Sequence, residues 1–223
     1  METEQHRGKS LTYLTILPDE YDPEKIYPLV IMLHGYGVNM HDLAGLTPMI
    51  SSTGYIYICP NAPIPLNSGP GMVGWAWTNP GESENSDEVQ RVERRLETLY
   101  AEVVETYRTP PKNAILLGFS QGGSMTYRTG LMHPELFTGL VALSCWLSDP
   151  ELIQSKLPED RGQSVFIAHG LQDNIDSGRR SKDFLESLGY SLSYNEYDMG
   201  HEINQQVLED LNAWMNITLP PSG

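Results

Sequence analysis

The stretch AILLGFSQGGSMTYRTGLM, residues 114–132, decides the fold. It begins with a short apolar run, 114–119, of the kind that suits a strand buried on both faces. A glycine-flanked serine follows, and the remainder has the character of a helix that begins with small residues. The stretch therefore predicts a strand at 114–119, a sharp turn at Ser120 and a helix at 121–132.

The turn matches the pattern G-x-S-x-G through Gly118, Phe119, Ser120, Gln121 and Gly122. Between a buried strand and a helix, this pattern forms a strained turn in which glycines permit close packing and the serine hydroxyl is exposed. The start of the helix also favours negative charge at that hydroxyl. We therefore predict a nucleophilic serine here rather than a plain Gly-Ser loop.

Outside this stretch, short runs rich in Val, Ile and Tyr alternate with segments of helical periodicity. We predict further strands at 11–17, 29–33, 55–59, 139–145, 164–168 and 191–199, the first of them antiparallel and near the sheet edge. We predict further helices at 87–107, 178–188 and 203–214. Strands that alternate with helices indicate βαβ units. The expected fold class is α/β, the α/β-hydrolase fold, with a mostly parallel central sheet and helices on both faces.

The length of 223 residues suits a single domain spanning 1–223. One irregular stretch, about 60–84, is rich in proline and glycine and carries two tryptophans. Long loops that hold apolar residues are often functional. We therefore expect a lid-like loop there.

Composition excludes several classes of partner and location. The chain has 14 basic and 29 acidic residues and a formal net charge of −15, which argues against nucleic acid as a partner. No apolar window approaches the length of a membrane span, so we expect no stable membrane insertion. The two cysteines, Cys59 and Cys145, lie in apolar runs and imply no disulfide framework. With no signal-like segment at the N-terminus, we expect a cytoplasmic protein.

A serine hydroxyl needs a base within hydrogen-bond reach, and the base needs a third group to orient it. In this fold the triad follows the chain order serine, acid, histidine, for which only His169 and His201 leave room. His201 follows the last predicted strand and lets Asp173, in the loop after the strand at 164–168, fall between. We therefore predict His201 as the base and Asp173 as the acid. The competing carboxylates are Asp176, Asp149 and Asp198.

An oxyanion hole requires two backbone N–H groups. We assign one to Gln121, directly after the serine, and the other to Tyr36 in the loop after the strand at 29–33. Apolar side chains on loops near this edge are candidates for substrate binding, with core packing as the alternative. They are Met72, Trp75, Trp77, Trp146 and Ile175. No HExxH, CxxC, GxGxxG or P-loop pattern is present, so we expect neither a metal nor a cofactor.

These residues resemble the phospholipase/carboxylesterase family of α/β-hydrolases, which includes acyl-protein thioesterases. The resemblance rests on seven ordered blocks: LHGYG at 33–37, PNAP at 60–63, the W-x-W block at 75–77, GFSQGG at 118–123, HPELFTGLVALS at 133–144, HGLQD at 169–173 and GHE at 200–202. It implies the same triad and the same two oxyanion donors. Tyr36 stands where members commonly carry leucine, which would reshape the acyl pocket. Thr78-Asn79 stands where many carry an aspartate after the tryptophan block, which affects the loop rather than the chemistry.

The sequence thus predicts a serine carboxylesterase that hydrolyses short- to medium-chain esters through an acyl-enzyme. Thioester, amide or lysophospholipid hydrolysis would use the same machinery, and a non-catalytic binding module of the same fold is a rival of another class. The expected partner is a small-molecule ester. The apolar loop and the resemblance also admit a homodimer.

Overall fold

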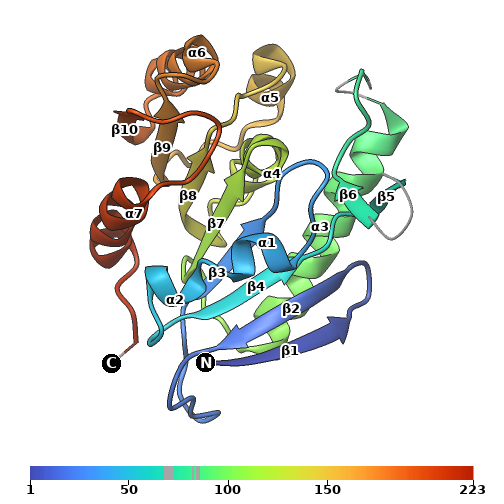
Figure 1. The fold of residues 1–223 in the computed structure, drawn as a ribbon, viewed down its shortest axis with the longest axis vertical. Coiled ribbons are helices and arrows are strands. Elements are labelled where there is room, and N and C mark those ends of the chain that lie inside the picture. Colours follow the sequence, from blue (N-terminus) through green and yellow to red (C-terminus); the bar gives the residue numbers. More distant parts are fainter. Residues whose placement is uncertain (68–72, 82, 84–85, 223) are drawn as a thin grey trace.

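The computed structural model describes residues 1–67, 73–81, 83 and 86–222 (Figure 1). Within this part of the chain, eight strands form one sheet in the order β1-β2-β4-β3-β7-β8-β9-β10. Their bounds are β1 Glu2–Arg7, β2 Thr12–Leu17, β3 Leu29–Leu33, β4 Ile56–Pro60, β7 Ala114–Phe119, β8 Phe137–Leu143, β9 Ser164–Gly170 and β10 Ser191–Tyr197. The six strands from β4 to β10 in this order are parallel, and β2 pairs antiparallel with both β4 and β1.

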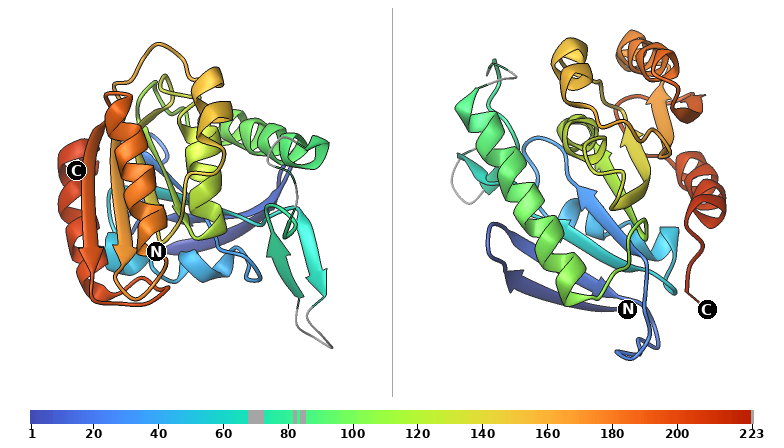
Figure 2. Two further views of the ribbon diagram at one scale, coloured as in Figure 1. Left: turned by 90° about the horizontal axis from the view of Figure 1, so that it is seen from above. Right: turned by 180° about the vertical axis from the view of Figure 1, so that it is seen from behind.

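Helices cover both faces of the sheet, as the view from above shows (Figure 2). Side chains of α3, α4, η1, α5 and α6 share one apolar cluster, and side chains of α1, α2 and α7 share the other. The helices are α1 His41–Ala44, α2 Thr47–Ile50, α3 Asp87–Thr106, α4 Gln121–Met125, η1 Thr126–Gly130, α5 Pro150–Lys156, α6 Ile175–Ser187 and α7 Gln205–Thr218. The predicted α/β-hydrolase fold, a mostly parallel sheet with helices on both faces, is confirmed.

The central strands divide their side chains between the two clusters. In β3, Leu29 and Ile31 enter one cluster and Val30 enters the other, and all three are fully buried. Successive side chains of a strand point to opposite faces, so a strand covered on both sides must be apolar throughout. The continuous apolar runs of the sequence are therefore the central strands of the sheet.

Four parallel strands end at the same edge of the sheet, and the segments that follow them carry the candidate site. The carboxyl ends of β3, β7, β9 and β10 lead to His34, Ser120, Asp173 and His201 respectively. Ligands of open α/β sheets bind at this edge. The topology alone thus brings together residues that are up to 167 positions apart in the sequence.

Three local features differ from the sequence-based expectation. Residues 2–7, for which the sequence predicted no strand, form the edge strand β1, whose backbone pairs with β2 while its side chains remain mostly exposed. The stretch 60–84, expected to be irregular, contains an antiparallel hairpin of β5 (Ile64–Asn67) and β6 (Val73–Ala76).

The third difference lies in the helix predicted at 121–132. It is α-helical only through Met125 and continues as the π-helical turn η1. The hydroxyls of Thr126 and Thr129 donate to the carbonyls four residues earlier, at 3.1 and 2.9 Å. Such back-bonding bends helices, and π-helical turns are frequent beside functional sites.

Candidate active site

Ser120 occupies a strained turn between β7 and α4. Its φ of 53° and ψ of −121° lie in a region that L-residues rarely adopt. The turn is this tight because the flanking glycines approach other backbone closely. A Cβ on Gly118 would lie 2.3 Å from the carbonyl carbon of Gly122, and a Cβ on Gly122 would lie 2.0 Å from the carbonyl oxygen of Leu33. The two glycines of the motif therefore meet the steric requirement of this turn.

The side chains of Ser120, His201 and Asp173 form one hydrogen-bonded chain. The Nε2 atom of His201 lies 2.9 Å from the Oγ atom of Ser120, and its Nδ1 atom lies 2.7 Å from Oδ2 of Asp173. An ionised carboxylate only accepts hydrogen bonds, so Nδ1 carries the proton and donates to Asp173. The lone pair of Nε2 then faces the serine hydroxyl and can accept its proton.

Asp173 is held in its charged form. Partial burial favours the neutral acid, but the hydrogen bond from His201 and the backbone N–H of Asn174 outweigh it and lower the pKa of Asp173. The Nε2 atom of His169 lies 3.4 Å from the same Oδ2 atom without hydrogen-bond geometry. Burial lowers the pKa of His169, so it is neutral at pH 7. His169, the alternative base of the sequence analysis, is thus next to the carboxylate of Asp173. Among the described hydrogen bonds it makes none to Ser120.

The loop after β3 is fixed against the hairpin. The N–H of Gly37 donates to the carbonyl of Trp75, and the N–H of Trp75 donates to the carbonyl of Val38, both at 2.9 Å. Within the described residues, the N–H of Tyr36 donates to no carbonyl in the loop hydrogen bonds, and the N–H of Gln121 is at the first position of α4, where helices provide no internal acceptor. Both groups are therefore able to bind an anion.

A buried histidine fixes the start of the same loop. The N–H of Ala62 donates to Nε2 of His34 at 3.0 Å, so Nδ1 carries the proton and donates to the carbonyl of Gly35 at 2.7 Å. Burial lowers the pKa of His34 to about 4. The bond from Ala62 needs an unprotonated Nε2 and favours the neutral imidazole, as burial does, whereas the bond to the carbonyl of Gly35 raises the pKa by less than burial lowers it.

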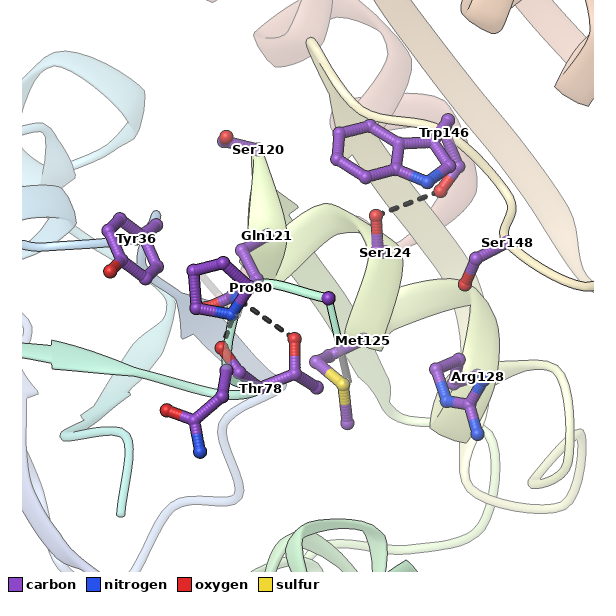
Figure 3. Close-up of a pocket in the computed structure, with 12 residues that line it drawn as sticks. Tyr36, Thr78, Pro80, Ser120, Gln121, Ser124, Met125, Arg128, Trp146 and Ser148 are labelled. Carbon is purple, nitrogen blue, oxygen red and sulfur yellow. Dashed lines mark hydrogen bonds between the residues drawn. The ribbon is translucent and has the colours of Figure 1, made fainter. Parts of the chain in front are cut away.

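The side-chain amide of Gln121 connects the turn at Ser120 to the segment after β6. Its Oε1 atom accepts from the N–H of Trp77, and its Nε2 atom donates to the carbonyl and the hydroxyl of Thr78, each at 2.8 Å. Figure 3 shows the two bonds to Thr78 beneath Pro80. The side-chain amide can accept two hydrogen bonds and donate two, and three of these four are made here. They hold segment 77–78 next to the serine.

A cavity of about 280 Å³ opens beside Ser120. Tyr36 and Trp146 lie on opposite sides of it, with Ser120 between them (Figure 3). Its far end is formed by Met125, Ser148 and Arg128. The guanidinium of Arg128 is almost completely buried and pairs with the carboxylate of Glu93 on α3, the Nη2 atom lying 2.6 Å from Oε1. The cavity therefore has an aromatic side chain on each of two opposite sides and a charged group at its far end.

The candidate binding residues are distributed over several places. Trp146 lines the cavity and is about half exposed. Trp77 is fully buried, and its indole N–H donates to the carbonyl of His34 at 2.8 Å, so it belongs to the core beneath the site and lines no part of the cavity. Trp75 borders a separate hollow beside β1, and Ile175 begins α6 outside the lining of this cavity. Met72 lies outside the described residues.

Sequence reasoning did not predict that the remaining lining residues would form part of the cavity. They are Thr78, Asn79, Pro80, Gly81, Ser124, Met125, Arg128 and Ser148. The sequence did contain a signal for Arg128: it is a single charged residue among small, polar and apolar residues after the turn. A lone charge on a buried helix face requires a partner. Thr78 was noted only as a departure from the family pattern, because its contact with the side chain of Gln121 is made across the fold. In the part of the chain that is described, no three His, Cys, Asp or Glu side chains are grouped as metal ligands.

The strand order, with a strained serine turn between β7 and α4, defines this protein as an α/β-hydrolase. The family model "Phospholipase/Carboxylesterase" matches residues 20–219. The chain therefore belongs to the phospholipase/carboxylesterase family of hydrolases.

Individual relatives agree with this assignment. Acyl-protein thioesterase 1 of Cryptococcus neoformans var. neoformans is 31% identical over 237 residues, which cover 92% of this chain and 97% of that protein. A probable carboxylesterase of Oryza sativa subsp. japonica is 28% identical over 172 residues, 73% of this chain and 65% of that protein. The crystal structure of esterase PE8 aligns with a TM-score of 0.80 at 24% identity over 92% of this chain and 97% of that one, and shares the fold.

No helix formed by the described residues is long and apolar enough to cross a membrane.

Proposed function

We propose that this hydrolase is a serine carboxylesterase that cleaves short- to medium-chain carboxylic esters through an acyl-enzyme. The observation that carries the proposal is the hydrogen-bonded chain Ser120–His201–Asp173, with contacts of 2.9 and 2.7 Å. A hydroxyl, a neutral imidazole and an ionised carboxylate in this order are the components of nucleophilic acyl transfer.

The proposed reaction has two halves. His201 removes the proton of Ser120 as the hydroxyl attacks the ester carbonyl, and the backbone N–H groups of Gln121 and Tyr36 stabilise the oxyanion. His201 then protonates the departing alcohol, which leaves the acyl group on Ser120. Water, deprotonated by His201, attacks the acyl-enzyme, and the carboxylic acid departs with the serine proton restored. Asp173 stabilises the transient imidazolium in both halves.

The size of the cavity supports a preference for small acyl groups. Pockets that enclose drug-sized ligands measure about 300–1,000 Å³. The cavity beside Ser120, at about 280 Å³, is slightly smaller than that range. Its end at Arg128 and Ser148 also places a charged group and a hydroxyl group where a long alkyl chain would need apolar surface.

Thioester hydrolysis is the second candidate, because the curated relatives include acyl-protein thioesterases. The same nucleophile and oxyanion donors would serve a thioester.

Lysophospholipid hydrolysis is less favoured, since the net charge of −15 opposes approach to anionic bilayers. A non-catalytic binding module would have no need of the Ser120–His201–Asp173 arrangement. Free, buried Cys59 and Cys145 support a reducing, cytoplasmic location.

The test is hydrolysis of nitrophenyl esters from two to sixteen carbons by the wild type, Ser120→Ala and Ser124→Ala. Ser124 lines the same cavity, but its hydroxyl donates to the carbonyl of Trp146 at 2.8 Å and not to His201, so it is the matched control. We expect activity to peak at short chains, to disappear in Ser120→Ala and to persist in Ser124→Ala. Full activity in Ser120→Ala would refute the proposal, and a large excess of thioester over matched oxyester turnover would favour the second candidate.

A further inference from the structure

The described cavities include two hollows that share no lining residue with the cavity just discussed. One, of about 230 Å³, is lined by His201, Phe119, Leu46 and Ile203, among others, and does not include Ser120. The other, of about 400 Å³, shares Leu46 and Ile203 with it and extends to Met49. The shared residues make the two hollows one groove, which begins at the imidazole and continues between α2 and α7. These helices pack against each other and lie side by side in Figures 1 and 2.

The chemistry of acyl transfer relates this groove to one part of an ester. The alcohol oxygen must come within hydrogen-bond reach of Nε2 of His201 to receive its proton. The acyl carbon must bond to Ser120, with its oxygen at the N–H of Gln121. The cavity beside Ser120 and Gln121 therefore suits the acyl part, and the groove that begins at His201 suits the alcohol part.

The groove combines an apolar floor with an acidic rim. Leu43, Leu46 and Phe119 provide apolar surface at its start, and Leu208 and the half-exposed Met49 provide it further along.

Three carboxylates, Asp42, Glu202 and Glu209, line the same surface, and among its described lining residues there is no lysine or arginine. Asp42 and Glu202 are in the hollow that touches His201, and Glu209 is in the second hollow, where its carboxylate accepts from Gln205 at 2.7 Å. All three residues are exposed, so their attraction for a ligand is moderate and depends on ionic strength.

We propose that this groove, from His201 past Ile203 and Leu46 to Met49, binds the alcohol part of the substrate and selects alcohols that are apolar and positively charged over anionic ones. The inference rests on the proposed function and adds the substrate class. An apolar body would cover the floor, and an ammonium group would lie near Glu202 and Asp42. An anionic leaving group, such as one that carries a phosphate or sulfonate, would be repelled.

The test compares butyryl esters that differ only in the charge of the alcohol. Butyrylcholine and 3,3-dimethylbutyl butyrate have the same shape, because a quaternary carbon replaces the quaternary nitrogen, and the butyryl ester of isethionate supplies the anionic case. Hydrolysis is followed by titration of released acid at pH 8 and low salt. The variants are Glu202→Gln, Asp42→Asn and, as a control, Glu151→Gln, which removes an exposed charge on α5, on the other face of the sheet.

We expect wild-type kcat/KM to follow the order cationic, neutral, anionic. The cationic-to-neutral ratio should fall by about two- to fivefold for each groove carboxylate removed, and should fall with added salt. Glu151→Gln should leave it unchanged. Because the readout is a ratio of two substrates, a general loss of catalysis in a variant cancels.

A wild-type ratio of one or less, or a ratio that Glu202→Gln and Asp42→Asn leave intact, would overturn the groove assignment while Ser120-dependent hydrolysis still supported the proposed function. Absence of Ser120-dependent hydrolysis of all three esters would overturn the proposed function, and this inference with it.

Discussion

Replacing Gly122 by alanine tests whether close backbone contact positions the serine turn. A Cβ at this position would lie 2.0 Å from the carbonyl oxygen of Leu33 and 2.6 Å from that of His34. Ordinary contact begins at 3.4 Å, so the start of α4 and the end of β3 must separate by about 1.4 Å. Both obstacles are backbone atoms in a packed sheet, which cannot rotate away as a side chain could.

We expect two effects of this separation. Overpacking of this kind costs about 1–3 kcal/mol of the free energy of unfolding. A displacement of about 1 Å at a reacting group can lower the rate by about 10²-fold. The Gly122→Ala variant should therefore show a lower urea midpoint and a kcat for nitrophenyl butyrate reduced by about two orders of magnitude.

Gly200→Ala is the matched control, because it adds the same methyl group next to His201. No heavy atom of the described residues lies within 4 Å of a Cβ built there. We expect its free energy of unfolding to remain within about 0.5 kcal/mol of the wild type, with activity retained. If Gly122→Ala had the stability and kcat of Gly200→Ala, the close contact would not position the serine, and this reasoning would be wrong.

Three further predictions concern the supports of the site. Asp173→Asn should lower kcat about 10⁴-fold with little change in KM, because an amide N–H facing Nδ1 places the other imidazole proton toward Ser120; an unchanged kcat would exclude the assigned acid. Gln121→Ala keeps its backbone N–H but removes the three bonds to segment 77–78, so urea unfolding should show a loss of about 1–4 kcal/mol, against no loss if these bonds are replaced by water. The lowered pKa of His34, about 4 against 6.5, means that the unfolded chain binds its proton first. Stability should therefore fall as the pH falls from about 6.5 to 4, and a His34→Gln variant that kept the same slope would contradict this.

The sequence was sufficient to predict the parts of the fold that depend on local pattern. The strands at 29–33 and 114–119 were predicted at their observed bounds, because strands buried on both faces are continuously apolar and end where glycine or polar residues begin. The edge strand β1 was missed for the complementary reason. Its side chains are polar and mostly exposed, so only the backbone pairing with β2 defines it, and backbone pairing leaves no side-chain pattern.

The candidate site divides in the same way. The proximity of Ser120, Asp173 and His201 could be predicted because each follows a recognisable strand, and parallel strands end at one edge. The location of Trp77 could not be found in this way. Its aromatic character fits a pocket as well as a core. Trp77 lies in the core, where its indole N–H donates to the buried carbonyl of His34, and the sequence does not show this contact. The same limit applies to Arg128, whose place at the end of the cavity depends on Glu93, 35 positions earlier in the sequence.

The central claim is that Ser120 is the nucleophile that carries the acyl group. The most direct test is to treat the wild type and Ser120→Ala with a fluorophosphonate, which phosphonylates activated serines, and to locate the label by mass spectrometry of the intact chain and its peptides. The account predicts one label per wild-type chain, on the peptide that contains Ser120, and none on the variant. A label on another residue, or equal labelling of Ser120→Ala, would contradict it.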